Sequence, residues 1–274
     1  MVLGGFLPAP QFEAYIEDAR PKLDASAVES LWSEHQAAKS FVKRLPAEDV
    51  ANVGEAPLSK QFAFRASEIQ TSPEFVEVYG ERPVRFATVK PDRLGVFQFQ
   101  IRVGGRTLSK EPSLVLDECL PRTFDLDVDL EIIGNPSTGT FQVAAGTDTG
   151  NVHLVKVHVD HERHLVELPF VPNRNWVQIA HLEKRYWIHN GYHRIYNLMA
   201  LGVDRIPCII FEAQAPVEVV GNVLDPQSFE VLKTMPRPPI MKDYFSKAAI
   251  KVPRRRRKNR LLATVQLGLE RVPF

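Results

Sequence analysis

Apolar residues first follow a helical period between residues 26 and 45. The residues from Leu23 to Ser26 offer helix caps, and Glu29 stands where a capping-box partner of Ser26 belongs. Pro46 ends the helix. One face of this helix should pack on a core, and its members are Val28, Leu31, Trp32, His35, Phe41, Val42 and Leu45. Residues 46–83 show weak periodicity and predict an irregular connection with a short helix near 66–70.

The pattern then changes to strands. Residues 84–89 and 96–103 are rich in β-branched and aromatic residues, and a Gly-Gly pair ends the second run. Residues 124–132 alternate apolar side chains with acidic ones, which predicts a half-buried strand with one acidic face. Residues 152–159 and 165–171 flank a polar turn at residues 160–163, and the apolar residues 261–269 predict a terminal strand.

A further hairpin is predicted over residues 177–182 and 185–190, with Glu183 and Lys184 at its turn. A short helix follows from Tyr192 to Leu201, where Gly202 is a natural stop. Residues 206–211 form a continuous apolar run typical of a buried strand. Another helix begins at Asp225, an N-cap followed by proline.

Composition narrows the class of protein without naming an activity. The 274 residues contain no apolar run of the roughly 18 residues that cross a bilayer and no secretory signal, so we expect no membrane partner. Cys119 and Cys208 are the two cysteines and form no CxxC pair, which favours a reducing, cytoplasmic setting.

The net charge of +1 conceals an uneven distribution. Residues 251–260 hold seven of the 34 basic side chains and no acidic one, which leaves 27 bases against 33 acids elsewhere. Clustered arginines bind phosphate backbones without reading their sequence. The candidate nucleic-acid contacts are Arg254, Arg255, Arg256, Arg257 and Lys258. The alternative is a solvated loop that balances the acidic body.

The turn between the second hairpin and its helix is the strongest candidate for ligand binding. It consists of Asn190, Gly191, Tyr192, His193 and Arg194. A glycine there lets the backbone approach a ligand closely, and the first helical turn presents N–H groups that favour an anion. Arg194 and His193 can add donors to a phosphate. The alternative is structural: Arg194 pairs with a carboxylate, His193 satisfies a carbonyl and Tyr192 packs.

Residues 176–211 resemble the ParB/sulfiredoxin-like superfamily, in which a hairpin leads through a G-x-H-R turn into a helix and an Ile-Pro return strand. Here Gly191-Tyr192-His193-Arg194, then Leu201-Gly202-Val203, and then Ile206-Pro207 match. The resemblance implies a core of this type and a bound nucleotide or phosphorylated small molecule. Sulfiredoxins have a cysteine where Tyr192 stands, ParB-type clamps commonly a glutamate, and related free-serine kinases an aspartate where Asn190 stands. The binding turn is therefore carried over and the known catalytic sets are not.

These patterns predict an α+β fold, a mixed sheet with short helices, with the ParB/sulfiredoxin-like core in the C-terminal half. The expected divisions are a helical and irregular region over 1–80, a β-rich region packed on the core over 81–150, the ParB/sulfiredoxin-like domain over 151–250, and a basic loop with a terminal strand over 251–274.

Two further clusters were weighed as metal sites. Seven of the eight histidines lie between residues 153 and 193, but strand parity separates them, and we predict no metal on histidine. Asp125, Asp127 and Asp129 share a strand face that can hold Mg²⁺ beside a phosphate, or can simply be solvated. Glu162, Glu167 and Glu183 are candidates for an upstream catalytic carboxylate, to which the sequence assigns no residue.

Three functions follow. The first is a nucleotide- or phosphate-binding protein, acting as a nucleotide hydrolase or phosphotransferase with Mg²⁺ if it is an enzyme. The second is a nucleic-acid-binding protein that uses the core and the basic run. The third is a catalytically inactive scaffold, which Tyr192 at the usual catalytic position favours.

Overall fold

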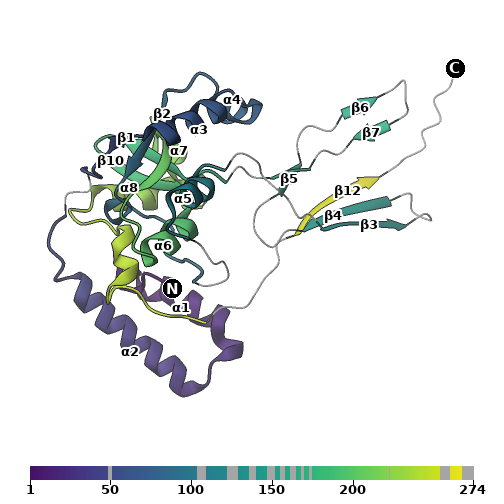
Figure 1. The fold of residues 1–274 in the computed structure, drawn as a ribbon. Coiled ribbons are helices and arrows are strands. Elements are labelled where there is room, and N and C mark those ends of the chain that lie inside the picture. Colours follow the sequence, from purple (N-terminus) through teal and green to yellow (C-terminus); the bar gives the residue numbers. More distant parts are fainter. Residues whose placement is uncertain are drawn as a thin grey trace. The chain divides into compact units, whose positions relative to one another are not determined.

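The chain folds into two compact units, each built from two segments: residues 1–122 with 175–255, and residues 123–174 with 256–274 (Figure 1). The structure is a computed structural model. It describes residues 1–48, 51–103, 109–121, 129–135, 140–146, 152–154, 158–160, 165–167, 170–172, 175–221, 223–253 and 260–266. The second unit is therefore inserted into the first and completed by the end of the chain.

A five-stranded mixed sheet forms the centre of the first unit. Its order is β1 (Ala56–Pro57), β2 (Val84–Val89), β11 (Ile206–Glu212), β9 (Gln178–Leu182) and β10 (Arg185–Asn190). The β11–β9 pair is parallel and the other pairs are antiparallel. Residues 206–211 are buried, as their apolar run predicts, because β11 is covered on both faces. The α+β class is confirmed.

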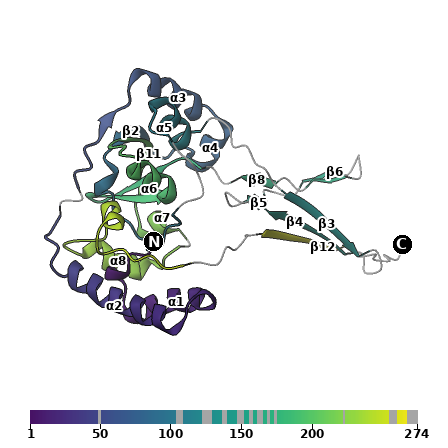
Figure 2. The same ribbon diagram turned by 60° about the horizontal axis from the view of Figure 1, so that its bottom comes forward.

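Short helices surround this sheet. They are α1 (Ala9–Ala19), α2 (Ala25–Val42), α3 (Lys60–Gln70), α4 (Pro73–Tyr79), α5 (Pro112–Cys119), α6 (Tyr192–Ala200), α7 (Pro216–Val220) and α8 (Pro226–Thr234). The 3-10 turns are η1 (Gly4–Phe6), η2 (Arg20–Lys22), η3 (Pro91–Arg93) and η4 (Met241–Phe245). In both ribbon views α3 and α4 lie at one end of this unit and α1 and α2 at the other (Figures 1 and 2).

The predicted first helix is present as α2, with its cap moved. Asp24 is the N-cap, and its side chain accepts a hydrogen bond from the N–H of Ala27 at 2.8 Å. Ser26 instead donates its hydroxyl to Asp24. Leu31 and His35 face the core as expected, and the His35 ring stacks on Phe12.

Two predictions for the N-terminal half were wrong. Residues 46–83 contain α3 and α4 rather than an irregular connection, and the short helix expected near 66–70 is the end of α3; α1 and α5 correspond to no predicted element. Serines at positions 59 and 72 cap α3 and α4. Residues 96–103 form no regular strand, because their neighbours are irregular segments; Val96 N–H donates to Pro239 O and Ile101 N–H to Met1 O.

The second hairpin, α6 and the return strand are confirmed. Gly202 has φ +81° at the end of α6, the left-handed region that glycine enters without strain. The register of the hairpin differs from the simple two-residue prediction, because a bulge near Ile188 pairs Gln178 with Asn190 instead of His189. Asp225 caps α8 as predicted.

Among its described residues, the second unit contains three small sheets. The strands are β3 (Asp129–Asn135), β4 (Thr140–Gly146), β5 (Val152–Leu154), β6 (His158–Asp160), β7 (Leu165–Glu167), β8 (Phe170–Pro172) and β12 (Arg260–Gln266). The terminal strand β12 pairs with β4, which pairs with β3; β5 pairs with β8, and β6 with β7.

The observed units differ from the predicted divisions at 80, 150 and 250. Strand β2 belongs to the central sheet beside β11, so this sheet needs residues from before 150. Residues 151–174 belong to the second unit. Pairing between remote segments decides these boundaries, and no linker composition marks them.

Candidate functional site

The predicted binding turn joins β10 to α6. Gly191 is the N-cap of α6 and has φ +104°, so an L side chain would be strained there. A Cβ on Gly191 would also lie 3.0 Å from Cγ2 of Val177. The chain can therefore pass from strand into helix within one residue, which requires glycine at this position.

Arg194 binds the protein's own backbone. Its Nη1 donates to the carbonyl of Glu118 at 2.9 Å, and its Nη2 donates to the carbonyl of Trp176 at 3.3 Å. Glu118 lies in the last turn of α5, where carbonyls lack partners within the helix. Arg194 thus ties α6 to the end of α5.

The end of α5 and the start of β9 form what we call the neck, residues 118–121 and 175–177. Four successive carbonyls of its first segment, residues 118–121, accept hydrogen bonds. The carbonyl of Glu118 accepts from the Arg194 guanidinium and that of Cys119 from the Val177 N–H. The carbonyl of Leu120 accepts from the Arg65 guanidinium and that of Pro121 from the Trp176 indole. The neck stands where the chain leaves the first unit and returns to it.

Tyr192 and His193 point to different environments. Tyr192 is buried, its hydroxyl accepts a hydrogen bond from the N–H of Phe97 at 3.2 Å, and burial raises its pKa. His193 is exposed and Asn190 is half-buried. Of the five predicted ligand-binding residues, Tyr192 is therefore part of the core, and His193 is the most accessible side chain.

The start of α6 differs from the starts of the other α-helices that the structure describes. Side chains of Asp24, Ser59, Ser72 and Asp225 cap α2, α3, α4 and α8, and proline occupies the first turn of α1, α5 and α7. α6 has neither device and no acidic side chain in its first turn. The positive end of α6 therefore has no side-chain cap and no acidic side chain in its first turn to offset it.

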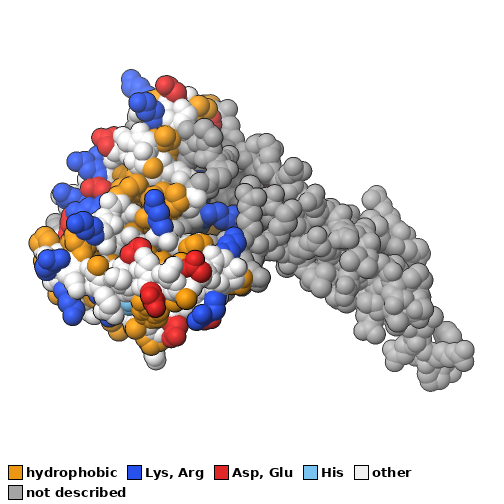
Figure 3. Space-filling model, turned by 90° about the horizontal axis from the view of Figure 1, so that it is seen from below, with side chains coloured by type: hydrophobic (Ala, Val, Ile, Leu, Met, Phe, Trp, Pro, Cys, Tyr) orange, Lys and Arg blue, Asp and Glu red, His pale blue; other side chains and the backbone are white. Residues whose placement is uncertain are grey.

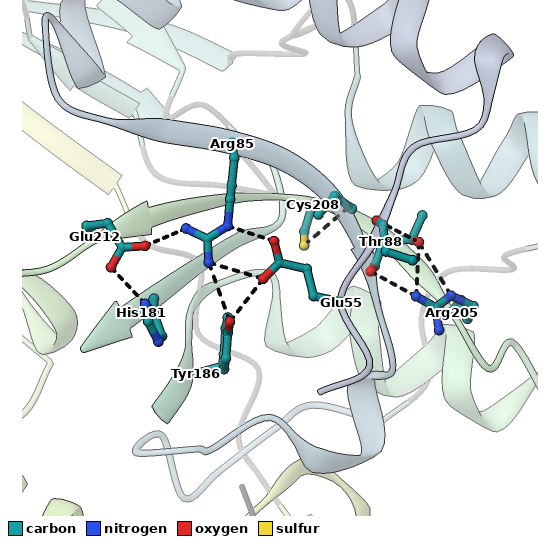
Figure 4. A network of polar contacts seen from close by, with 10 residues as sticks. Glu55, Arg85, Thr88, His181, Tyr186, Arg205, Cys208 and Glu212 are labelled. Carbon is teal, nitrogen blue, oxygen red and sulfur yellow. Dashed lines mark hydrogen bonds and ion pairs between the residues drawn. The ribbon is translucent and has the colours of Figure 1, made fainter. Parts of the chain in front are cut away.

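A second group of polar side chains lies on the central sheet (Figure 4). We call it the sheet cluster, and its members are Glu55, Arg85, His181, Tyr186 and Glu212. Arg85 donates from Nε to Glu55 Oε1 at 2.7 Å and from Nη1 to Glu212 Oε1. The Tyr186 hydroxyl donates to Glu55 Oε2 at 3.0 Å. Residues far apart in the sequence therefore meet around one guanidinium.

Within the sheet cluster, Glu212 binds two partners. Its Oε2 lies 2.7 Å from Nδ1 of His181, whose ring stacks on Tyr186 with centroids 4.4 Å apart. Burial opposes ionisation of Glu212, but hydrogen bonds from His181 and Arg85 outweigh it and lower its pKa. The hydrogen bond from Arg85 likewise lowers the pKa of Glu55. Both carboxylates are ionised at neutral pH.

The histidines of the second hairpin have separate partners. His181 binds Glu212, while Nδ1 of His189 lies 2.8 Å from the Val219 carbonyl and its ring packs edge-on against Phe211. Among the described residues, no three His, Cys, Asp or Glu side chains come together as metal ligands. Both cysteines are buried and free, and burial raises the pKa of Cys119 to about 12.

Several predicted positions lie outside the described residues. They are Arg254, Arg255, Arg256, Arg257 and Lys258 of the basic run, Asp125 and Asp127 of the acidic row, and Glu162. On the face drawn in Figure 3, the described Lys and Arg side chains are interspersed with acidic ones and form no uniformly basic surface. The nucleic-acid hypothesis thus stays a prediction that depends on the basic run.

Of the candidate carboxylates, Glu183 is described in full. It occupies the hairpin turn with φ +58° and accepts a hydrogen bond from Lys233 at 2.8 Å. Its side chain is exposed and is absent from both groups of polar residues above. We therefore assign Glu183 to the turn.

Sequence reasoning missed most of the sheet cluster. Two signals were present: a charged residue, Arg85, inside an apolar strand, and Glu212 at the end of the most apolar run. Neither signal names its partner, because Glu55 is 30 residues from Arg85 and Glu212 is 127 residues from it.

Comparison with protein-family models, with curated proteins and with solved structures found no significant match. The resemblance to the ParB/sulfiredoxin-like superfamily therefore rests on the motif in residues 176–211. None of the helices in the described part of the chain is both long and apolar enough to cross a bilayer.

Proposed function

We propose that this protein binds a nucleotide through its phosphates at the start of α6. The observation that carries the proposal is the helix start itself: Gly191 brings strand and helix together, and neither a side-chain cap nor proline occupies the first turn. Helix starts of this kind favour anions through backbone N–H groups and the macrodipole. The motif resemblance points to the same ligand class.

The side chains have distinct roles in this proposal. His193 is exposed and supplies a donor to the phosphate. Arg194, which donates to two neck carbonyls, holds the turn in place and adds charge nearby. Tyr192 anchors the turn through its buried hydroxyl.

An aromatic pair, of which Phe245 is exposed and Tyr196 half-buried, favours a nucleotide over a bare phosphate. Tyr196 lies one helical turn after His193, and helical side chains lean back toward the N-terminus. Its ring stacks on Phe245 with centroids 4.6 Å apart and planes 13° apart, and Phe245 is 46% exposed. A base that stacks on such a surface gains about 1–3 kcal/mol.

The test is thermal stabilisation of the purified chain by ATP, CTP, GTP and tripolyphosphate, with and without Mg²⁺. At about 100 times Kd, a ligand should raise Tm by roughly 5–10 °C. His193→Glu places a negative charge in the first turn and should abolish the shift with every polyphosphate. His193→Gln, which keeps a donor without the charge, should retain most of it.

A second variant separates the base from the phosphate. Phe245→Leu should weaken nucleotide binding about 5- to 10-fold and leave tripolyphosphate binding unchanged. If none of the ligands stabilises the protein, or if His193→Glu responds as the unmodified chain does, the α6 start is not a phosphate site. The scaffold hypothesis would then become the preferred one.

A further inference from the structure

The sheet cluster determines which nitrogen of His181 can accept a proton. The Glu212 carboxylate is ionised and can only accept a hydrogen bond, so the proton between it and His181 belongs to Nδ1. In the neutral ring the lone pair is then on Nε2. A carboxylate that holds Nδ1–H in this way fixes both the tautomer and the ring orientation.

Nε2 of His181 is available to a ligand. The His181 side chain is 22% exposed. Within the described residues no group hydrogen-bonds Nε2, and this atom is not fully buried. Tyr186 covers one face of the ring by stacking. The ring is thus held on two sides, by Glu212 and Tyr186, while its basic nitrogen is left accessible.

Arg85 fixes Glu212 in turn. It binds Oε1 of this carboxylate while His181 binds Oε2, so the two oxygens have separate, defined partners. Glu55 Oε1 accepts a hydrogen bond from Nε of the same guanidinium at 2.7 Å. The relay from Glu55 through Arg85 and Glu212 to His181 supplies the rigid support that an acid–base group needs.

We propose that His181 is the general base of a second site, which removes a proton from water or a hydroxyl group during attack on a neutral or cationic substrate. Glu55, Glu212 and Arg85 carry one net negative charge when the imidazole is neutral, which disfavours phosphates. Glu212 and Arg85 are positioning residues. This site goes beyond the nucleotide proposal and does not depend on it.

The proposed step balances with water as the nucleophile. Nε2 takes a proton from water, the hydroxide oxygen bonds to an acyl carbon, and the bond from that carbon to the leaving oxygen breaks. The leaving group departs as an alkoxide or phenolate, and the imidazolium returns its proton to solvent or to that group.

The probe is hydrolysis of p-nitrophenyl acetate, a neutral ester with a coloured leaving group, measured on the full chain across pH. The protein-catalysed rate should rise with pH, because a general base acts in its unprotonated form. His181→Gln should lower the protein-catalysed rate about 10-fold or more, and Glu212→Gln should lower it about 10-fold. The matched control Glu230→Gln removes an exposed carboxylate on α8 and should leave the rate unchanged.

A second measurement needs no folded variant of His181. Diethyl pyrocarbonate acylates a histidine at its free nitrogen. Peptide mass spectrometry should find this label on His181 in the chain without substitutions, and the labelling of His181 should be several-fold slower in Glu212→Gln. Absence of this label, or hydrolysis that survives in His181→Gln, would overturn the proposal.

Discussion

The α6 start and the sheet cluster use charged side chains in opposite ways. At the α6 start, Arg194 donates to the backbone carbonyls of Glu118 and Trp176, and His193 is the exposed side chain. In the sheet cluster the side chains bind one another, and Nε2 of His181 is left for a ligand. The turn from strand to helix at Gly191 is therefore formed while the arginine of that turn serves the fold.

The sharpest test of this contrast is Arg194→Ala. Two carbonyls of the neck would lose their donors, which should lower the free energy of unfolding by about 2–3 kcal/mol. Urea denaturation measures the change, and Arg194→Lys, which keeps the charge and part of the donor set, should recover about half. Unchanged stability with lost ligand binding would show instead that Arg194 binds the ligand.

A smaller loss is expected when Arg85 is replaced by methionine. Glu55 and Glu212 would lose their shared partner, but both are partly exposed, so water softens the effect to about 1–2 kcal/mol. Chemical denaturation of Arg85→Met, Glu55→Gln and the double variant forms a double-mutant cycle. Strict additivity would mean that Arg85 and Glu55 do not stabilise one another.

The next prediction concerns the stability of the fold at acidic pH, where His189 is protonated. Burial lowers its pKa below the ordinary 6.5, so the folded chain binds fewer protons than the unfolded chain. Stability is therefore full above pH 6.5 and falls as pH drops toward the folded pKa. Below about pH 4.5, protonation of Glu55 and Glu212 adds a further loss, since their pKa values are lowered too. Unfolding curves between pH 4 and 8 should show a shallower slope for His189→Asn than for the parent in the upper window.

The smallest stability effect belongs to His193→Glu. A negative charge in the first turn of α6 should leave stability unchanged or raise it by about 0.3–1 kcal/mol. The same denaturation experiment as for Arg194→Ala measures it. A clear loss of stability would indicate that His193, like Arg194, serves the fold.

Local signals accounted for much of the fold. The hairpin, α6, β11 and α8 follow from periodicity, the turn at Glu183 and the cap at Asp225, because each depends on neighbours in the sequence. Residues 96–103 were misread as a strand because their β-forming composition does not reveal that the available partners are irregular segments. The position of β2 beside β11 depends on contacts across more than a hundred residues.

The candidate sites divide in the same way. Gly191 and His193 can be identified from the motif because the strand, the turn and the helix are consecutive. The sheet cluster cannot, since Glu55, Arg85 and Glu212 come from three separate strands or their ends. The carbonyl partners of Arg194 were equally hidden, because backbone acceptors leave no trace in residue identity.

The neck has a consequence for how this architecture can be altered. The indole of Trp176 donates to the carbonyl of Pro121 at 3.3 Å, so the outgoing and returning backbones of the insertion lie beside each other. Joining two such neighbouring ends requires little loop-closure entropy. Replacing residues 123–174 with a short polar loop, and ending the chain before residue 256, should therefore yield a viable miniature of the first unit. The same junction is a place where a foreign domain can be grafted.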